Sequence, residues 1–153
     1  MTMKRKTPTT LLTLALVAAL LLTGCQPPKL ASLSNEQVVG VMVKLLTAIN
    51  AGDYPGFSRD FSPSMLTAIP EAQFTDLKTM LQNVSGKYVS CKTTPQLSNS
   101  QGYAIYRLSC SFELEPVIVT VTIKTGGTQV EGLFFDSTNL RNVGKKTPTP
   151  ANG

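Results

Sequence analysis

The apolar residues of this chain change their spacing at Gly86, and this change restricts the fold more than any other feature of the sequence. Before Gly86, apolar side chains recur every three or four residues, which is the period of a helix with one buried face. The first such stripe consists of Val38, Val41, Met42, Leu45 and Ile49. After Gly86, apolar and polar residues alternate, which is the period of a half-buried strand. Helices followed by strands predict an α+β fold.

Capping signals position the helices. Ser34 and Gln37 form a capping-box pattern at the start of the first helix, and Gly52 can end that helix in a left-handed conformation. Further helix starts are predicted at Asp53, Ser62 and Pro70.

Four strands are expected after Gly86, near residues 89–97, 104–114, 117–123 and 130–135. Turn-forming residues at 99–102 and the pair Gly126-Gly127 separate strands that follow one another closely. Short connections join antiparallel neighbours, so we predict a curved four-stranded antiparallel meander with the helices packed on its apolar face.

The first 24 residues predict export. Lys4, Arg5 and Lys6 precede an apolar run over residues 11–22, as in a secretory signal. That run is short for a permanent span, which needs about 20 apolar residues. The sequence Leu22-Thr23-Gly24-Cys25 resembles the lipobox of bacterial lipoproteins. The resemblance implies that Cys25 receives a diacylglycerol, becomes the first mature residue and holds the protein on a membrane through acyl chains such as palmitate.

These signals predict a signal peptide over 1–24, a tether over 25–33, one α+β domain over 34–143 and a disordered tail over 144–153. The predicted location is the bacterial cell envelope, with the domain outside the cytoplasm. The alternative is an ordinary signal peptide cut at another position, with Cys25 incidental.

The charge and the residue types exclude several functions. The formal charge is +5, but Lys4, Arg5 and Lys6 belong to the signal, and no basic patch with interleaved aromatic residues predicts a nucleic-acid partner. The chain has no histidine, which rules out a Ser-His-Asp triad and makes a metal site unexpected. We expect no cofactor.

Strand registers lead to two further predictions. In the first hairpin, one register sets Cys91 opposite Cys110, Val89 opposite Phe112, Thr93 opposite Leu108 and Leu97 opposite Ala104, so that the inward-facing residues match. Opposed cysteines in an exported protein predict a disulfide, the alternative being two buried thiols.

In the second hairpin, the register through Gly126-Gly127 sets Ile123 opposite Val130 and Val119 opposite Phe134. Ile118, Leu133 and Phe135 then form an apolar patch on the outer face. Such a patch predicts an interface with a second copy or an envelope protein, unless the segment after Asp136 covers it.

The segment Ala48-Ile49-Asn50-Ala51-Gly52-Asp53-Tyr54, followed by Phe57 and Phe61, resembles the opening of the domain of unknown function numbered 3887. The likeness extends over residues 33–136 and includes the Gly86-Lys87 start of the sheet. It implies the cone-shaped, cystatin-like fold of the nuclear-transport-factor-2-like superfamily, in which a curved sheet wraps helices around a pocket. It supplies no catalytic residues.

Two residues are candidates for such a pocket. Asp53 could act as a general base, or simply cap a helix, and Tyr106 could donate a hydrogen bond to a ligand, or be a core residue. We therefore expect a lipid-anchored, non-catalytic binding or scaffold domain for a small apolar ligand or a protein partner. The alternatives are a small isomerase-like or hydratase-like enzyme that uses Asp53 or Tyr106, and an envelope protein that inhibits or senses another protein through a loop such as 98–102.

Overall fold

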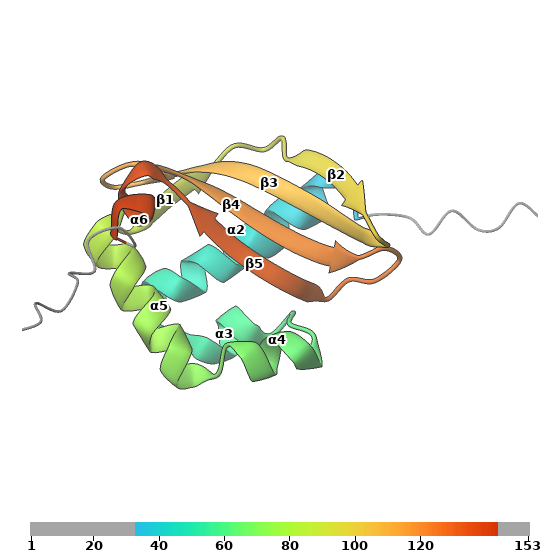
Figure 1. The fold of residues 1–153 in the computed structure, drawn as a ribbon, viewed down its shortest axis with the longest axis horizontal. Helices are drawn as coiled ribbons and strands as arrows, with labels where there is room; N and C mark the ends of the chain where they lie inside the picture. Colours follow the sequence, from blue (N-terminus) through green and yellow to red (C-terminus); the bar gives the residue numbers. More distant parts are fainter. Residues whose placement is uncertain (1–32, 144–153) are drawn as a thin grey trace, which may run out of the picture.

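The computed structural model describes residues 33–143, in which N-terminal helices pack on one antiparallel sheet (Figure 1). The helices before the sheet are α2 (Asn35–Ala51), α3 (Tyr54–Ser58), α4 (Pro63–Ala68) and α5 (Glu71–Val84). The strands are β1 (Tyr88–Cys91), β2 (Gln96–Ser100), β3 (Tyr103–Phe112), β4 (Pro116–Lys124) and β5 (Val130–Asp136), and α6 (Thr138–Val143) follows them. This order confirms the predicted α+β fold, with five strands instead of four. The predicted signal peptide, Cys25, most of the tether and the tail over 144–153 lie outside the described residues.

The helix boundaries follow the capping residues. The Ser34 amide donates to Gln37 Oε1 at 2.9 Å, and the Gln37 amide donates to Ser34 Oγ at 3.3 Å, which confirms the capping box. Gly52 ends α2 at a φ of 71°, where a side chain would be strained. Ser62 caps α4, with Pro63 in its first turn. Local chemistry therefore decides where each of these helices begins or ends.

The first hairpin differs from its predicted form. β3 pairs with both β1 and β2, because the segment 92–95 interrupts the predicted first strand. Pro95 lies in this break and has no amide proton to donate to a neighbouring strand. The turn consists of Gln101 and Gly102, with φ values of 48° and 81°. This is the two-residue geometry that matches strand twist, and it replaces the four-residue turn that we expected.

The changed turn and the break shift most of the predicted pairs in this hairpin. Cys91 lies opposite Cys110, as predicted. The other pairings are wrong: Tyr88 instead of Val89 faces Phe112, Leu97 faces Tyr106 instead of Ala104, and Thr93 lies in the break, outside both strands.

A bulge in β5 reverses the predicted outer patch. Ile123 pairs with Val130 as predicted, but Thr122 pairs with Gly132, so Glu131 is an extra residue. One extra residue moves every later side chain to the opposite face. Val119 consequently faces Phe135 and not Phe134. The structure therefore corrects the patch of Ile118, Leu133 and Phe135: Leu133 and Phe135 pack against the core, and of the three only Ile118 faces outward.

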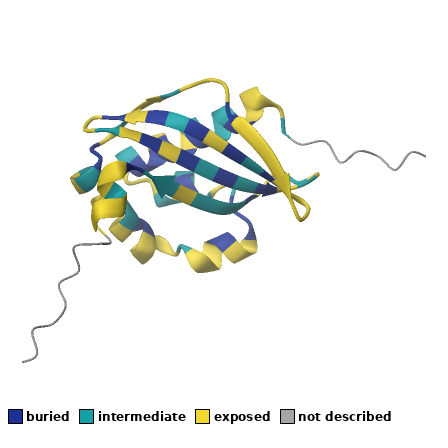
Figure 2. Cartoon of the chain, turned by 45° about the horizontal axis from the view of Figure 1, so that its top comes forward, coloured by how far each residue is buried: buried dark blue, intermediate teal, exposed yellow. Residues whose placement is uncertain are grey.

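The core lies between the helices and the inner face of the sheet. Figure 2 shows the alternation of buried and more exposed residues along β3 and β4. On the helical side, the Phe57 ring lies 4.8 Å from Phe61 and 4.7 Å from Phe74, measured between centroids. The largest fully buried side chains are those of Tyr106, Phe57, Met42, Leu46, Leu81 and Leu108. Large side chains thus occupy the space where the resemblance implied a pocket.

Candidate functional site

Asp53, the predicted pocket acid, lies at the surface as the N-cap of α3. Its Oδ1 accepts the Gly56 amide at 3.0 Å, and the residue is exposed. A side chain at Gly56 would clash with the same carboxylate. The carboxylate therefore has a helix-capping partner, and it does not point into the space between helices and sheet.

Tyr106, the second pocket candidate, is 0% exposed in the middle of β3. Its hydroxyl donates to the Leu33 carbonyl oxygen at 3.1 Å, immediately before α2 begins. A buried tyrosine hydroxyl needs such a partner, and here the bond joins the start of α2 to the sheet. Tyr106 is thus a core residue whose polar atom is already occupied.

The predicted cysteine pair is present as a disulfide. The Cα atoms of Cys91 and Cys110 lie 3.9 Å apart on the opposed strands β1 and β3. The pair is 19 residues apart in the sequence, and Cys91 is the last residue of β1. The bond therefore holds the short strand β1 onto β3 at the point where the break over 92–95 begins.

Asn50 completes the hydrogen bonding of the start of β1. Its Nδ2 donates to the Tyr88 carbonyl oxygen at 2.8 Å, and its Oδ1 accepts the Tyr88 amide at 3.0 Å. The Tyr88 ring contacts Phe112, with centroids 6.0 Å apart. Burial raises the pKa of the Tyr88 hydroxyl, because it disfavours the charged phenolate. This arrangement joins the last turn of α2 to the sheet edge.

Glu115, between β3 and β4, joins three elements. Its Oε1 accepts the hydroxyls of Ser85 at 2.7 Å and Ser137 at 2.6 Å, and its Oε2 accepts the Asn139 amide at 3.1 Å. Loss of hydration raises the pKa of Glu115, but these three bonds and the charge of Arg141 together outweigh it and lower the pKa. Glu115 therefore holds the end of α5 and the start of α6 against the same hairpin.

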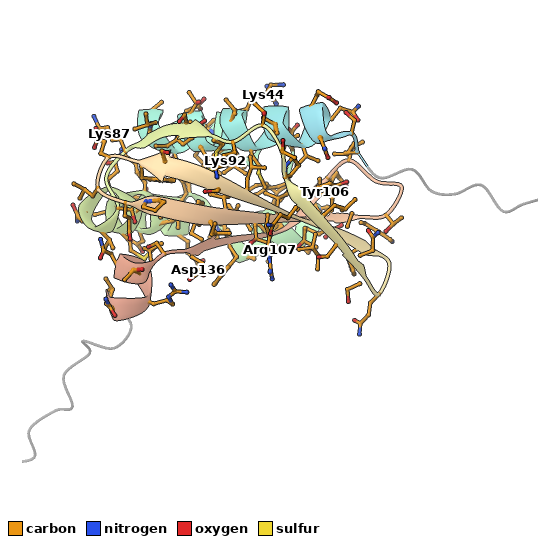
Figure 3. All side chains as sticks on the ribbon, turned by 90° about the horizontal axis from the view of Figure 1, so that it is seen from above. Lys44, Lys87, Lys92, Tyr106, Arg107 and Asp136 are labelled. Carbon is orange, nitrogen blue, oxygen red and sulfur yellow. A yellow bond between two sulfur atoms is a disulfide. The ribbon has the colours of Figure 1, made fainter. Side chains whose placement is uncertain are left out.

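Among residues 33–143, open grooves with volumes of about 420, 350 and 650 Å³ border the outward side of α2. Lys44 lines all three, and Gly40 and Arg59 each line two of them. Lys44 projects from α2 at the margin of the molecule in Figure 3. A Cβ atom added at Gly40 would meet no atom within 4 Å. No inward-facing sheet residue lines these grooves, so they lie outside the core.

The outer face of the sheet is the second candidate surface. Four opposed residues cross it in one row, from β2 to β5: Gln96, Arg107, Thr120 and Phe134. Phe134 is 63% exposed, and Arg107 is exposed beside Thr120. Figure 3 shows Arg107 and Asp136 on the sheet and Lys92 just after β1, away from Lys44 on α2.

Sequence reasoning missed Phe134 as an outward residue because the bulge reverses its face. A signal was present: Gly132 interrupts an apolar stretch, and an isolated glycine in a strand often marks a bulge. The α2 grooves gave no comparable signal, because they depend on how α3 and the break over 92–95 lie beside α2.

Residues 33–143 contain neither a metal-ligand cluster nor a membrane-spanning helix. This part of the chain contains no group of three or more His, Cys, Asp or Glu side chains that could hold a metal ion. Across the same residues, no helix is both long enough and apolar enough to span a membrane.

Comparison with known proteins gives a family. No curated protein matches the sequence. Residues 43–133 match the sequence profile of the family described as "Protein of unknown function (DUF3887)". This match runs from the middle of α2 to β5, and therefore includes the α2–α3 junction and all of β1 to β4. Because it covers more than half of the chain, the protein belongs to the DUF3887 family.

Proposed function

We propose that this protein is an exported, lipid-anchored binding domain that performs no chemistry and contacts a protein partner through the outward side of α2. The observation that carries the proposal is that the polar groups of both pocket candidates, Asp53 and Tyr106, are hydrogen-bonded within the domain. Asp53 caps α3, and the Tyr106 hydroxyl is bonded to Leu33 inside the core. Neither group faces a pocket between the helices and the sheet, where a general base of this fold would act: Tyr106 is occupied in the core, and Asp53 lies at the surface, where it also lines one of the grooves beside α2.

The grooves beside α2 support an external site. They combine partly buried apolar side chains of α2, such as Val39 and Val43, with the exposed Lys44. Apolar contact area with charged groups at its margin is the usual composition of a protein interface. Gly40 leaves room for close approach of another backbone. Glycine destabilises a helix, and no neighbouring atom within the domain requires a glycine at this position.

A substitution at Asp53 separates this proposal from the enzyme alternative. Asp53→Asn keeps the helix cap, since asparagine caps as well as aspartate, but removes the carboxylate. In a host strain that lacks the protein, we expect the Asp53→Asn variant to reverse the deletion phenotype fully. Because Asp53 also lines one of the α2 grooves, failure of a normally folded, normally abundant Asp53→Asn protein would favour the enzyme only if the Val43→Glu variant described next complements fully.

The complementary substitution is Val43→Glu in the largest groove, with Thr79→Glu on the exposed side of α5 as the matched control. We expect Val43→Glu to abolish complementation without changing the melting temperature, and Thr79→Glu to leave it intact. Equal complementation by both variants would contradict a site beside α2.

The β2–β3 hairpin is a second candidate contact, for a domain that inhibits or senses another protein. Every residue from Gln96 to Tyr103 is exposed, including Leu97 at 47% and Tyr103 at 38%. Leu97→Ser removes the most exposed apolar side chain of β2, and loss of complementation by this variant alone would favour the hairpin over α2.

A further inference from the structure

The two sides of the described domain differ in their balance of charges. Arg107 and Lys124 lie on the outer face of the sheet, and Lys92, the first residue of the break after β1, lies beside the outward-facing Ser109. Lys92 follows the inward-facing Cys91 and donates its amide to Ser109, and Lys124 follows the inward-facing Ile123. Within residues 33–143, none of these three cations has an acidic side chain within ion-pair distance.

The acidic side chains lie mainly elsewhere. Asp136, opposite Ile118, is an acid on the outer face of the sheet. Its Oδ2 lies 3.1 Å from Nη1 of Arg141, so this ion pair neutralises its charge. Glu113 and Glu115 lie in the hairpin at the end of the sheet, where Glu113 accepts the Lys87 amide. The helical side carries the remaining acids except Glu131 of β5: Glu36, Asp53, Asp60, Glu71 and Asp76. The outer face of the sheet is therefore mainly cationic, whereas the helical side carries its five acids together with the cations Lys44, Arg59 and Lys78.

Apolar side chains lie among these cations. Phe134 is 63% exposed, and Ile118 is 38% exposed one row away on β4. Thr120 lies opposite Phe134, and Ser109 lies opposite Ile118 on the β3 side. An exposed aromatic ring on the same face as these cations, with Thr120 between Phe134 and Arg107, matches the interface of a bilayer, where rings enter the headgroup level and basic residues meet anionic lipids.

We infer that the outer face of the sheet docks on the anionic surface of the lipid bilayer that carries the protein. This inference rests on the proposed lipid anchor at Cys25, which keeps the domain near that surface. The eight residues from Gln26 to Leu33 can span at most about 30 Å, and a domain of this size has a radius of gyration of about 13 Å. The outer face can therefore reach the bilayer. Since α3, α4 and α5 lie on the other side of the sheet, docking turns them away from the membrane (Figure 1).

The chain offers a clean probe of this contact because it contains no tryptophan. Phe134→Trp places a single indole on the proposed docking face, and Met80→Trp places one on α5 as the matched control. The full lipidated protein is reconstituted into vesicles of phosphatidylcholine alone or of phosphatidylcholine with phosphatidylglycerol, each with acyl-brominated lipid as a quencher. We expect quenching of the Phe134→Trp fluorescence in the phosphatidylglycerol vesicles only, reversed by salt, and no quenching of the Met80→Trp protein in either.

Charge substitutions test the electrostatic part. In the Phe134→Trp protein, Arg107→Gln should lower the ratio of docked to undocked domain about fivefold, which is the contribution of one basic side chain near an anionic surface. Lys78→Gln on α5 removes the same charge from the other side and should leave the ratio unchanged. Equal effects of the two substitutions would overturn the inference, since the response would then follow net charge alone.

Three other outcomes are decisive. If the Phe134→Trp protein floats with vesicles at high salt but shows no quenching at low salt, the anchor stands and the docking face is refuted. If the protein does not float with either vesicle, the proposed anchor itself fails. If a soluble polyanion such as heparin shifts the emission of the Phe134→Trp protein while phosphatidylglycerol vesicles do not quench it, the face binds a polymer and the membrane inference is overturned.

Discussion

Reduction of the Cys91–Cys110 disulfide should destabilise the domain by about 3 kcal/mol. In the chain-entropy account, the bond lowers the entropy of the unfolded chain by an amount that grows with the logarithm of the length of the closed loop. For a loop of this length, the stabilisation is about 3 kcal/mol. The sequence separation here is 19 residues. For a domain of this size, that loss should lower the melting temperature by roughly 10–15 °C.

The measurement is urea unfolding of the mature protein by circular dichroism, with and without dithiothreitol, after thiol counting has verified complete reduction. Because the reduced chain exposes more surface when it unfolds, the slope against urea should rise as the midpoint falls. Cys91→Ser is the matched control: it removes the bond at the half-buried partner and leaves Cys110 in the core.

The Cys91→Ser protein should match the reduced native protein and should not respond further to dithiothreitol. A change below about 1 kcal/mol upon verified reduction would refute the reasoning that the bond acts through the unfolded chain. A further response of Cys91→Ser to the reductant would show that the reagent acts elsewhere.

Three further predictions concern single residues. Gly40→Ala should stabilise the domain by about 0.5–1 kcal/mol in urea unfolding, since the position is inside a helix and the added methyl meets no atom; a loss of stability would contradict the open space at α2. Glu115→Gln should destabilise the domain by about 1 kcal/mol at neutral pH. Because the folded-state pKa of Glu115 is lowered, its contribution is complete above the ordinary glutamate pKa and is lost as the pH falls through the folded value, so the two proteins should converge in acid; a difference independent of pH would contradict this. Cys25→Ser should abolish labelling by a fatty-acid analogue in a bacterial host, and label on the serine protein would contradict acylation at that residue.

Helix boundaries could be read from the sequence because single side chains determine them. The Ser34–Gln37 capping box, the left-handed Gly52 and the caps at Asp53 and Ser62 act within four residues, and the structure confirms each. The Cys91–Cys110 pairing was also predictable, because two inward-facing cysteines on neighbouring strands have few partners. The rest of that register was not: the break over 92–95 and the two-residue turn change the pairing on either side of it.

The surfaces depended on details that alternation alone does not contain. An alternating pattern does not determine which set of residues faces the core once a bulge is present. The extra residue Glu131 puts Leu133, Phe134 and Phe135 on the faces opposite to those predicted. The grooves beside α2 are lined by residues far apart in the sequence, such as Thr93 and Val39. Both candidate surfaces therefore became visible only with the fold.

The side chain of Asn50 has a consequence for how this protein behaves when it is crowded. An exposed strand edge is a template on which another chain can add a strand, and the hazard grows with the local concentration of the protein. Asn50 supplies both a donor and an acceptor to the Tyr88 backbone, as a neighbouring strand would. The amide and carbonyl groups of Tyr88 are therefore already occupied. A side chain of α2 thus protects the edge of β1 at Tyr88 from pairing with a strand of another molecule.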